Sequence, residues 1–363
     1  MPCIQEGDKR RMRLKGFSIT LSVIALCSLG ALIPAAELPK ALPKLKLFST
    51  GGTIQGSGPR RDEVANYKAA QFTPKQLLDD LPEAAKLADI SYEEIAATGS
   101  GGIDTKIQLK LAKEINDWLA QPDSVGAIVT HGTATLEETA YFLNLVIHSD
   151  KPVLVVGAMR PHSAISGDGP LNLYNAFRTA VTPEARDKGV MVLLNDEISA
   201  ARDVTKTNTE RPNTFESRDL GPIGFADSDR IVFYRKLLYR HTHKSEFDVS
   251  KLDELPKVDI VYGYQEGDRT AVDALIAAGA KGIVLDDNAP GFNAAVKDGR
   301  AKGVVFVQSD RKGSGRVLEK ASTLERGVVT ADNLNAQKAR QLLRLALTKT
   351  SDPKEIQRMF DQY

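Results

Sequence analysis

The sequence predicts an α/β protein, with a larger N-terminal parallel-sheet domain and a smaller C-terminal α/β domain. Short apolar runs at 44–48, 127–130, 153–157 and 190–194 alternate with amphipathic segments, the pattern of a parallel sheet with helices on both faces. A similar alternation resumes after a polar stretch at 241–257. The chain has 363 residues, of which 42% are hydrophobic, and this length suggests two domains rather than one.

Two helices are predicted between the N-terminal strands. The segment 107–119 repeats its apolar positions at helical spacing, and the segment 135–146 has Glu137 and Glu138 in its first turn, where the helix dipole favours negative charge. The apolar stripe of the first helix consists of Ile107, Leu111, Ile115 and Leu119.

The C-terminal domain is predicted beyond the polar stretch 241–257, which we interpret as a linker whose His241 and His243 are solvated. The segments expected to form its strands and helices are 258–262, 271–278, 282–285, 303–307 and 338–347. The predicted domains are therefore 40–240 and 258–363.

The first 36 residues have the pattern of a secretory signal peptide. Basic residues between positions 9 and 15 precede an apolar run at 17–33, which small residues follow. A membrane anchor is the alternative, because the run approaches the length of a span. Cleavage would leave a periplasmic or secreted protein without membrane contact. Cys3 and Cys27 both lie in this segment, so the expected mature chain has neither disulfides nor thiolate chemistry.

The charge balance gives no reason to expect a nucleic-acid partner. The 48 basic residues are matched by 47 acidic ones, and no basic run is interleaved with aromatic residues in the body of the chain. The five histidines show no metal-ligand constellation, and the glycines do not form a dinucleotide fingerprint. We expect a small-molecule substrate, no metal and no cofactor.

A glycine-threonine cluster follows the first predicted strand. Two adjacent glycines before Thr53 allow a sharp bend and a close approach of the backbone to a ligand. The threonine then lies at the carboxyl end of a strand, where open α/β sheets bind ligands. The alternative is a plain turn with a capping threonine.

Similar polar clusters follow the later strands. Thr133 is predicted at a strand-to-helix turn with free amide donors, although an ordinary helix cap would look the same. Asp168 lies in a constrained loop, where aspartate is more often a loop or cap former than a catalyst. Lys206 lies among threonines, and a partly desolvated lysine can take a proton from a threonine hydroxyl. The alternative for Lys206 is a solvated surface side chain.

Together these motifs resemble the bacterial type II (periplasmic) L-asparaginases, including the asparaginase-glutaminases, from about residue 44 to the C-terminus. The matching text is Thr-Gly-Gly-Thr-Ile at 50–54, Thr-His-Gly-Thr at 130–133, Glu-Glu-Thr-Ala at 137–140, Gly-Ala-Met-Arg-Pro at 157–161, Arg-Asp-Val-Thr-Lys-Thr-Asn-Thr at 202–209 and Leu-Asn-Ala-Gln-Lys-Ala-Arg at 334–340. The order and separation of these motifs make a chance match very improbable.

The resemblance implies roles for individual residues. Thr53 would be the nucleophile that attacks the side-chain amide, and Tyr67 would be the mobile-loop tyrosine that relays its proton. Lys206 would activate Thr133, and Ser100 would bind the α-carboxylate of the substrate. The family also implies a homotetramer, a dimer of dimers whose sites are completed across an interface.

Four departures from the family pattern all concern recognition of the amino-acid backbone. Ala134 replaces the aspartate that pairs with the α-ammonium, and Gly101 replaces a polar side chain. The stretch 286–291 replaces a Gly-Asn-Gly loop, and Ser322 aligns with the glutamate of the partner subunit.

Three hypotheses follow. The first is an exported asparaginase that converts L-asparagine to L-aspartate and ammonia. The second is an amidase for a substrate without a free α-ammonium, which would explain Ala134 and Ser322. The third, a weakly active binding homologue, gives no reason for Thr53, Thr133 and Lys206 to occur together.

Overall fold

The computed structural model describes residues 41–363, with the side chains of Ser322 and Leu324 left aside. The predicted signal peptide, 1–36, lies outside the described residues. Within the described part, no helix is long and apolar enough to cross a membrane.

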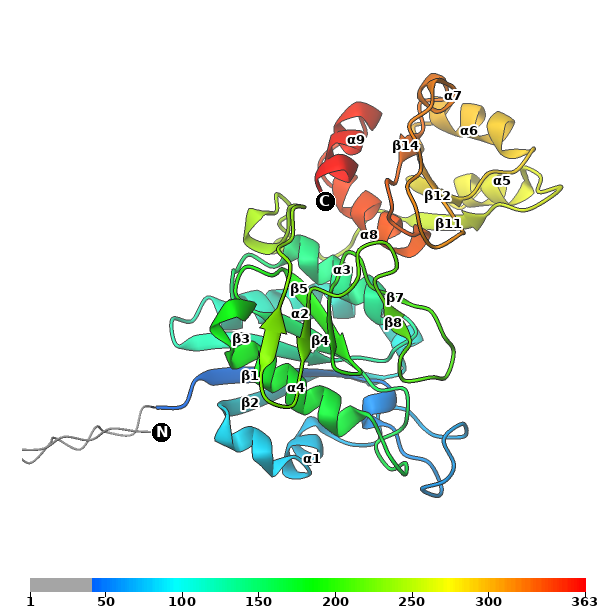
Figure 1. The fold of residues 1–363 in the computed structure, drawn as a ribbon. Coiled ribbons are helices and arrows are strands. Elements are labelled where there is room, and N and C mark those ends of the chain that lie inside the picture. Colours follow the sequence, from blue (N-terminus) through cyan, green and yellow to red (C-terminus); the bar gives the residue numbers. More distant parts are fainter. Residues whose placement is uncertain (1–40) are drawn as a thin grey trace, which may run out of the picture. The chain divides into compact units, whose positions relative to one another are not determined.

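A sheet of eight strands forms the N-terminal part (Figure 1), in the order β10-β9-β6-β5-β4-β3-β1-β2. The strands are β1 (Lys44–Gly51), β2 (Asp89–Thr98), β3 (Ser124–Thr130), β4 (Val153–Val156), β5 (Val190–Leu194), β6 (Glu197–Ala200), β9 (Gly224–Ala226) and β10 (Ile231–Phe233). The strands from β2 to β5 in this order pair in parallel, and β6, β9 and β10 extend the sheet antiparallel. The predicted parallel sheet is confirmed, whereas β2 and the antiparallel strands were not predicted.

Helices cover both faces of this sheet, which explains why its central strands are almost continuously apolar. Val129 of β3 packs in the cluster that contains residues of α2 (Thr105–Leu119) and α3 (Leu136–Val146). Its neighbour Ile128 packs in the cluster with α4 (Gly169–Val181) and the short α1 (Pro74–Asp79). Because successive side chains of a strand point to opposite faces, one strand contributes to both cores.

The predicted helix α2 has a capped amino end and a buried apolar stripe. Asp104 caps α2 by accepting a hydrogen bond from the backbone N–H of Ile107 at 2.9 Å. Of the predicted stripe, Leu111, Ile115 and Leu119 are buried and Ile107 packs against the same core. The short 3-10 helices are η1 (Thr53–Gln55), η2 (Pro82–Lys86), η3 (Ser100–Gly102), η4 (Pro183–Ala185) and η5 (Thr242–Lys244).

The C-terminal part contains a smaller parallel sheet, in the order β11-β12-β13-β14. Its strands are β11 (Val258–Tyr262), β12 (Gly282–Asp286), β13 (Val305–Ser309) and β14 (Val329–Thr330), and its helices are α5 (Thr270–Ala277), α6 (Phe292–Ala301), α7 (Ala321–Glu325), α8 (Ala336–Ala346) and α9 (Pro353–Gln362). The helix α8 contacts both this sheet and α3 of the N-terminal part (Figure 1). One hydrophobic cluster therefore contains residues from both sheets.

The stretch 241–257 is less solvated than its polar composition suggests. His241 is buried, with 3% of its surface exposed, so the prediction that it is solvated is wrong, whereas His243 is exposed. Phe247 and Val249 are buried in the core that both sheets share. The buried apolar residues at 247 and 249 hold the stretch against the protein, and His241 is buried at its start.

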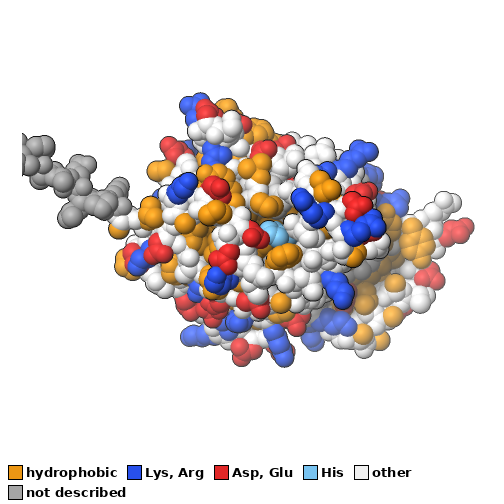
Figure 2. Space-filling view, turned by 90° about the horizontal axis from the view of Figure 1, so that it is seen from below, with side chains coloured by type: hydrophobic (Ala, Val, Ile, Leu, Met, Phe, Trp, Pro, Cys, Tyr) orange, Lys and Arg blue, Asp and Glu red, His pale blue; other side chains and the backbone are white. Residues whose placement is uncertain are grey.

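The surface carries interspersed charges. Figure 2 shows one face on which acidic, basic and apolar side chains alternate without a large field of either sign. This mixture agrees with the balanced charge of the chain.

Candidate active site

A pair of hydroxyl groups lies where β1 ends. Gly51 and Gly52 have positive φ angles of 99° and 85°, which favour glycine, and they turn the chain into η1. The side chain of Thr53 is buried there, and its Oγ1 lies 2.7 Å from the Tyr67 hydroxyl. Either hydroxyl can donate, so a proton can pass between the two oxygens.

Gln55 holds this turn in place. Its Oε1 accepts hydrogen bonds from the Gly51 backbone N–H at 2.9 Å and from Thr130 Oγ1 at 3.3 Å, and its Nε2 donates to the Phe72 carbonyl at 2.6 Å. Sequence analysis did not identify this residue. The only signal in the sequence was a glutamine directly after Ile54, and this pattern indicates no particular role unless the contacts of the side chain are known.

The second pair joins an amine to a hydroxyl. Lys206 Nζ donates to Thr133 Oγ1 at 2.8 Å. Thr133 lies in the turn between β3 and α3, and Lys206 ends the short strand β7 (Thr205–Lys206), which pairs with β8 (Phe215–Glu216). Burial lowers the pKa of the Lys206 amine below its ordinary value, so a larger fraction is neutral at a given pH.

The two turns meet at the carboxyl edge of the sheet. Thr50 Oγ1 donates to the Thr130 carbonyl at 2.8 Å, which joins the ends of β1 and β3. A Cβ atom on Gly52 would lie only 2.3 Å from Gly132 Cα. The backbones of the two glycine-threonine turns are therefore in direct contact, and the absence of side chains permits it.

Ser100 lies beside the second turn. A Cβ atom on Gly132 would lie 2.8 Å from the Cβ of Ser100, and Thr135 Oγ1 donates to the Ser100 carbonyl at 2.9 Å. Ala134 is exposed in the same turn, between Thr133 and Thr135. The structure thus brings Ser100 and Ala134 to the edge that carries the threonines.

Two further polar residues near this edge organise the backbone. The carboxylate of Asp168 accepts hydrogen bonds from the backbone N–H groups of Met159 and Arg160, each at 2.9 Å, as expected of a loop former. Burial lowers the pKa of His131 to about 4, so its ring is neutral at pH 7 and Nδ1–H donates to the Gly132 carbonyl at 2.8 Å. Among the residues that the structure describes, no group of three or more histidine, cysteine or acidic side chains is arranged to hold a metal ion.

A hydroxyl pair and a hydroxyl–amine pair at one sheet edge form the kind of site in which an enzyme uses an activated hydroxyl as nucleophile. Comparison with known proteins defines the family. Residues 44–239 match the family profile "Asparaginase, N-terminal", and residues 257–360 match "Glutaminase/Asparaginase C-terminal domain". The chain belongs to the asparaginase family and is a hydrolase of that type.

Individual relatives cover nearly the whole chain. L-asparaginase 2 of Bacillus subtilis is 48% identical, with 91% of this chain and 89% of that protein covered. The probable periplasmic L-asparaginase of Haemophilus influenzae is 42% identical, with 94% and 99% covered. The crystal structure of a probable cytoplasmic L-asparaginase from Campylobacter jejuni has a TM-score of 0.86 and 44% identity, and covers 89% of this chain and 100% of that one.

Proposed function

We propose that this protein hydrolyses L-asparagine to L-aspartate and ammonia through a threonine acyl-enzyme. The family supports the reaction class, and the named relatives support the substrate. We assign the catalytic residues mainly from one observation. The turns of Gly52 and Gly132 are in contact, so the Thr53–Tyr67 and Thr133–Lys206 pairs lie at the same carboxyl edge of the sheet.

In the first step, Thr53 Oγ1 bonds to the side-chain amide carbon of the substrate and the carbon–nitrogen bond breaks. The threonine proton passes through the Tyr67 hydroxyl toward the departing ammonia. The 2.7 Å separation of the two oxygens supports this relay, since proton transfer requires hydrogen-bond distance.

In the second step, water attacks the ester carbon, L-aspartate leaves and the proton returns to Thr53. The proposed role of Lys206 is to draw the proton of Thr133, so that this second hydroxyl can act as a base. Its lowered pKa supports the role, because only the neutral amine accepts a proton.

The carbonyl oxygen gains negative charge in both steps and needs hydrogen-bond donors. The N–H groups of Gly51 and Gly52 already donate to Gln55 Oε1 and to the Thr98 carbonyl, each at 2.9 Å. We therefore assign the oxyanion to the backbone N–H groups of Thr53 and Thr133.

Ser100 is proposed to bind the α-carboxylate, since it lies against the turn of Gly132. The α-ammonium would lie toward the exposed side of Ala134, where this chain has no carboxylate. An amidase for a substrate without that ammonium, and a weakly active binding homologue, remain the alternatives, and the comparisons do not favour either of them.

Ammonia release tests the proposal. Wild-type protein should release ammonia from L-asparagine faster than from succinamic acid, which is asparagine without its α-amino group. The variant Thr53→Ala should lose this turnover, whereas Thr348→Ala, two residues beyond the end of α8, should retain it. Release from succinamic acid alone would favour the shifted amidase, and saturable binding without release would favour the binding homologue.

The larger organisation is part of the proposal. We propose a leader at 1–36, domains at 40–240 and 258–363 joined at 241–257, and a homotetramer built as a dimer of dimers in the periplasm or outside the cell. The two matched family profiles support the division, and the name of the Haemophilus influenzae relative supports the location. Sedimentation of the mature chain and fractionation of the source cells test assembly and location.

A further inference from the structure

The amino end of α8 touches both chain segments that carry the Thr133–Lys206 pair. Thr133 lies in the turn that leads into α3, and Lys206 follows Val204 and Thr205 at the end of β7. The contacts come from Asn335 and Lys338, which belong to the C-terminal part of the protein and are absent from the mechanism described above.

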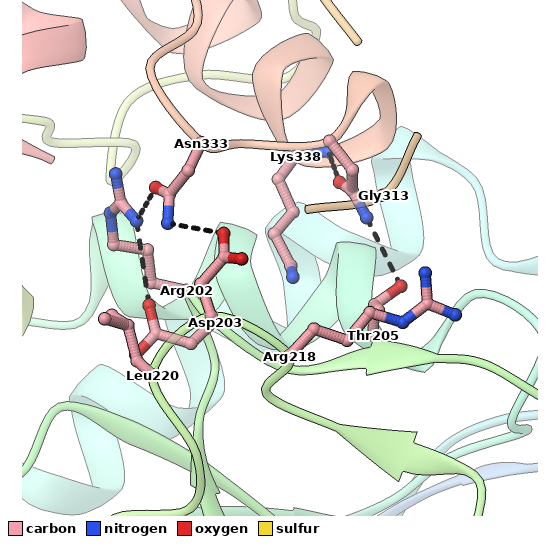
Figure 3. Close-up of a pocket in the computed structure, with 10 residues that line it drawn as sticks. Arg202, Asp203, Thr205, Arg218, Leu220, Gly313, Asn333 and Lys338 are labelled. Carbon is pink, nitrogen blue, oxygen red and sulfur yellow. Dashed lines mark hydrogen bonds and ion pairs between the residues drawn. The ribbon is translucent and has the colours of Figure 1, made fainter. Parts of the chain in front are cut away.

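Lys338 joins the two segments directly. Its side chain is buried, its ammonium donates to the Val204 carbonyl, and Nζ lies 3.4 Å from Glu137 Oε2 on α3. Figure 3 shows Lys338 pointing from its helix toward the segment of Asp203 and Thr205. One amine thus holds the Lys206 segment and the helix that follows Thr133.

Asn335 repeats the same connection with its amide. Its Nδ2 lies 3.1 Å from Glu137 Oε2 and 3.4 Å from Thr205 Oγ1, and it donates to both. Its Oδ1 accepts from the Lys338 backbone N–H at 3.0 Å and so caps α8. The cap fixes Asn335 and Lys338 relative to each other.

The charges around Lys338 are arranged as a small buried network. Burial lowers the pKa of the Lys338 amine below its ordinary value, the carboxylates of Glu137 and Asp203 act in the opposite direction, and the nearby Arg202 lowers it further. A polar cavity of about 30 Å³ borders Asp203, Asn335 and Lys338 (Figure 3), and it has room for about one water molecule.

Buried ion pairs contribute little net stability. The network is therefore not needed to hold α8 against α3, because apolar packing does this. Hydrogen bonds are directional, however, and tolerate much smaller displacements than hydrophobic contacts do. The distinctive effect of this network is therefore to fix positions.

We propose that Lys338 and Asn335 are positioning residues for the proposed amide hydrolysis. Through Glu137 they fix the start of α3, which follows the Thr133 turn, relative to the Val204–Lys206 segment. They so maintain the 2.8 Å contact between Lys206 Nζ and Thr133 Oγ1. These two residues of the C-terminal part thereby affect kcat through the Thr133–Lys206 pair, without touching the substrate themselves. This inference rests on the proposed function.

The variant Asn335→Ser tests it, because serine retains a helix-capping oxygen and lacks the amide that reaches Glu137 and Thr205. We expect kcat to fall about 10- to 100-fold with KM changed less than about twofold, since small misplacements of catalytic groups have large effects. Asp352→Ala is the control, because Asp352 caps α9 through the Lys354 N–H and has no link to Lys206. It should lower the melting temperature and leave kcat unchanged.

A double-mutant cycle separates positioning from general destabilisation. Thr205→Val removes the hydroxyl that Asn335 contacts, so Asn335→Ser combined with Thr205→Val should lose no more kcat than the worse single variant. Additive losses, or a lower melting temperature with unchanged kcat, would overturn the proposal. Lys338→Met should reduce kcat in the same way, and the cycle remains decisive if that variant does not fold.

A crystal structure of Asn335→Ser provides a readout that does not depend on turnover. The separation of Lys206 Nζ from Thr133 Oγ1 should exceed 2.8 Å, and an unchanged separation would contradict the inference. If the wild-type protein released no ammonia from asparagine, the proposed function would fail while this distance could still be compared.

Discussion

At the scale of single residues, Lys206 combines partial burial with one hydroxyl contact. Burial lowers its pKa below the ordinary lysine value of 10.5, and the described residues add no carboxylate that raises it again. Because the neutral amine is the form that accepts a proton, turnover should rise with pH as Lys206 deprotonates. This rise should lie below pH 10.5.

The variant Lys206→Met should remove that rise from the pH profile of kcat and lower kcat about 10²- to 10⁴-fold, the usual contribution of a general base. Lys86→Met, at an exposed position, is the control and should have the wild-type profile. If Lys206→Met kept the pH dependence, the titrating group would be a different one.

Ala134 stands where the resemblance to the asparaginases implies an aspartate. An aspartate in this exposed turn position would offer the α-ammonium of asparagine a charged hydrogen bond, so Ala134→Asp should raise kcat/KM about 10- to 100-fold. Succinamic acid has no ammonium and should not benefit, and Ala134→Asn should have a much smaller effect. Equal gains for both substrates would show that position 134 acts in another way.

At the scale of elements, the site depends on two turns that approach each other at glycines. The variant Gly52→Ala should lower kcat/KM about 100-fold or more, because its Cβ would overlap Gly132 Cα at 2.3 Å and push the two turns apart. Activity and melting temperature should be measured together.

Gly279→Ala is the matched control for this variant. Its φ of 86° is nearly that of Gly52 at 85°, but its Cβ would meet no atom within 4 Å. It should therefore lose only the stability that a left-handed backbone costs, about 1–2 kcal/mol, and keep full activity. Equal losses of activity in both variants would assign the effect to backbone strain alone.

Local apolar patterns in the sequence predicted some strands of the large sheet and missed others. The strands β3, β4 and β5 are buried on both faces and were predicted from their continuous apolar runs, and β1 was predicted from the apolar residues Leu45, Leu47 and Phe48. The strand β2 has exposed residues, among them Tyr92, and lacks such a run, so it was missed. An edge strand obtains its structure from pairing with β1, which a local pattern does not reveal.

At the scale of the whole molecule, one hydrophobic cluster includes residues of both sheets, with α8 between them. Leu342→Ala, at a fully buried position of α8, should lower the free energy of unfolding by about 2–5 kcal/mol. Because the cluster is shared, the loss should appear in a single urea transition. Leu318→Ala, at a side chain that is 59% exposed, should change stability by less than about 0.5 kcal/mol, and two separate transitions would contradict a shared core.

The sequence by itself determined the fold class and the family, because apolar periodicity and the glycine-threonine motifs are local properties of the chain. It also identified Thr53, Tyr67, Thr133 and Lys206 as candidate site residues, through motifs that lie far apart along the chain. Only the tertiary structure decided which atoms meet, as between Gly52 and Gly132, and only it showed that His241 is buried. It also placed Gln55 against the Gly51 backbone and Lys338 against the Val204 carbonyl. The physical reason is that burial and hydrogen bonding depend on long-range packing, and a residue type alone does not specify its partners.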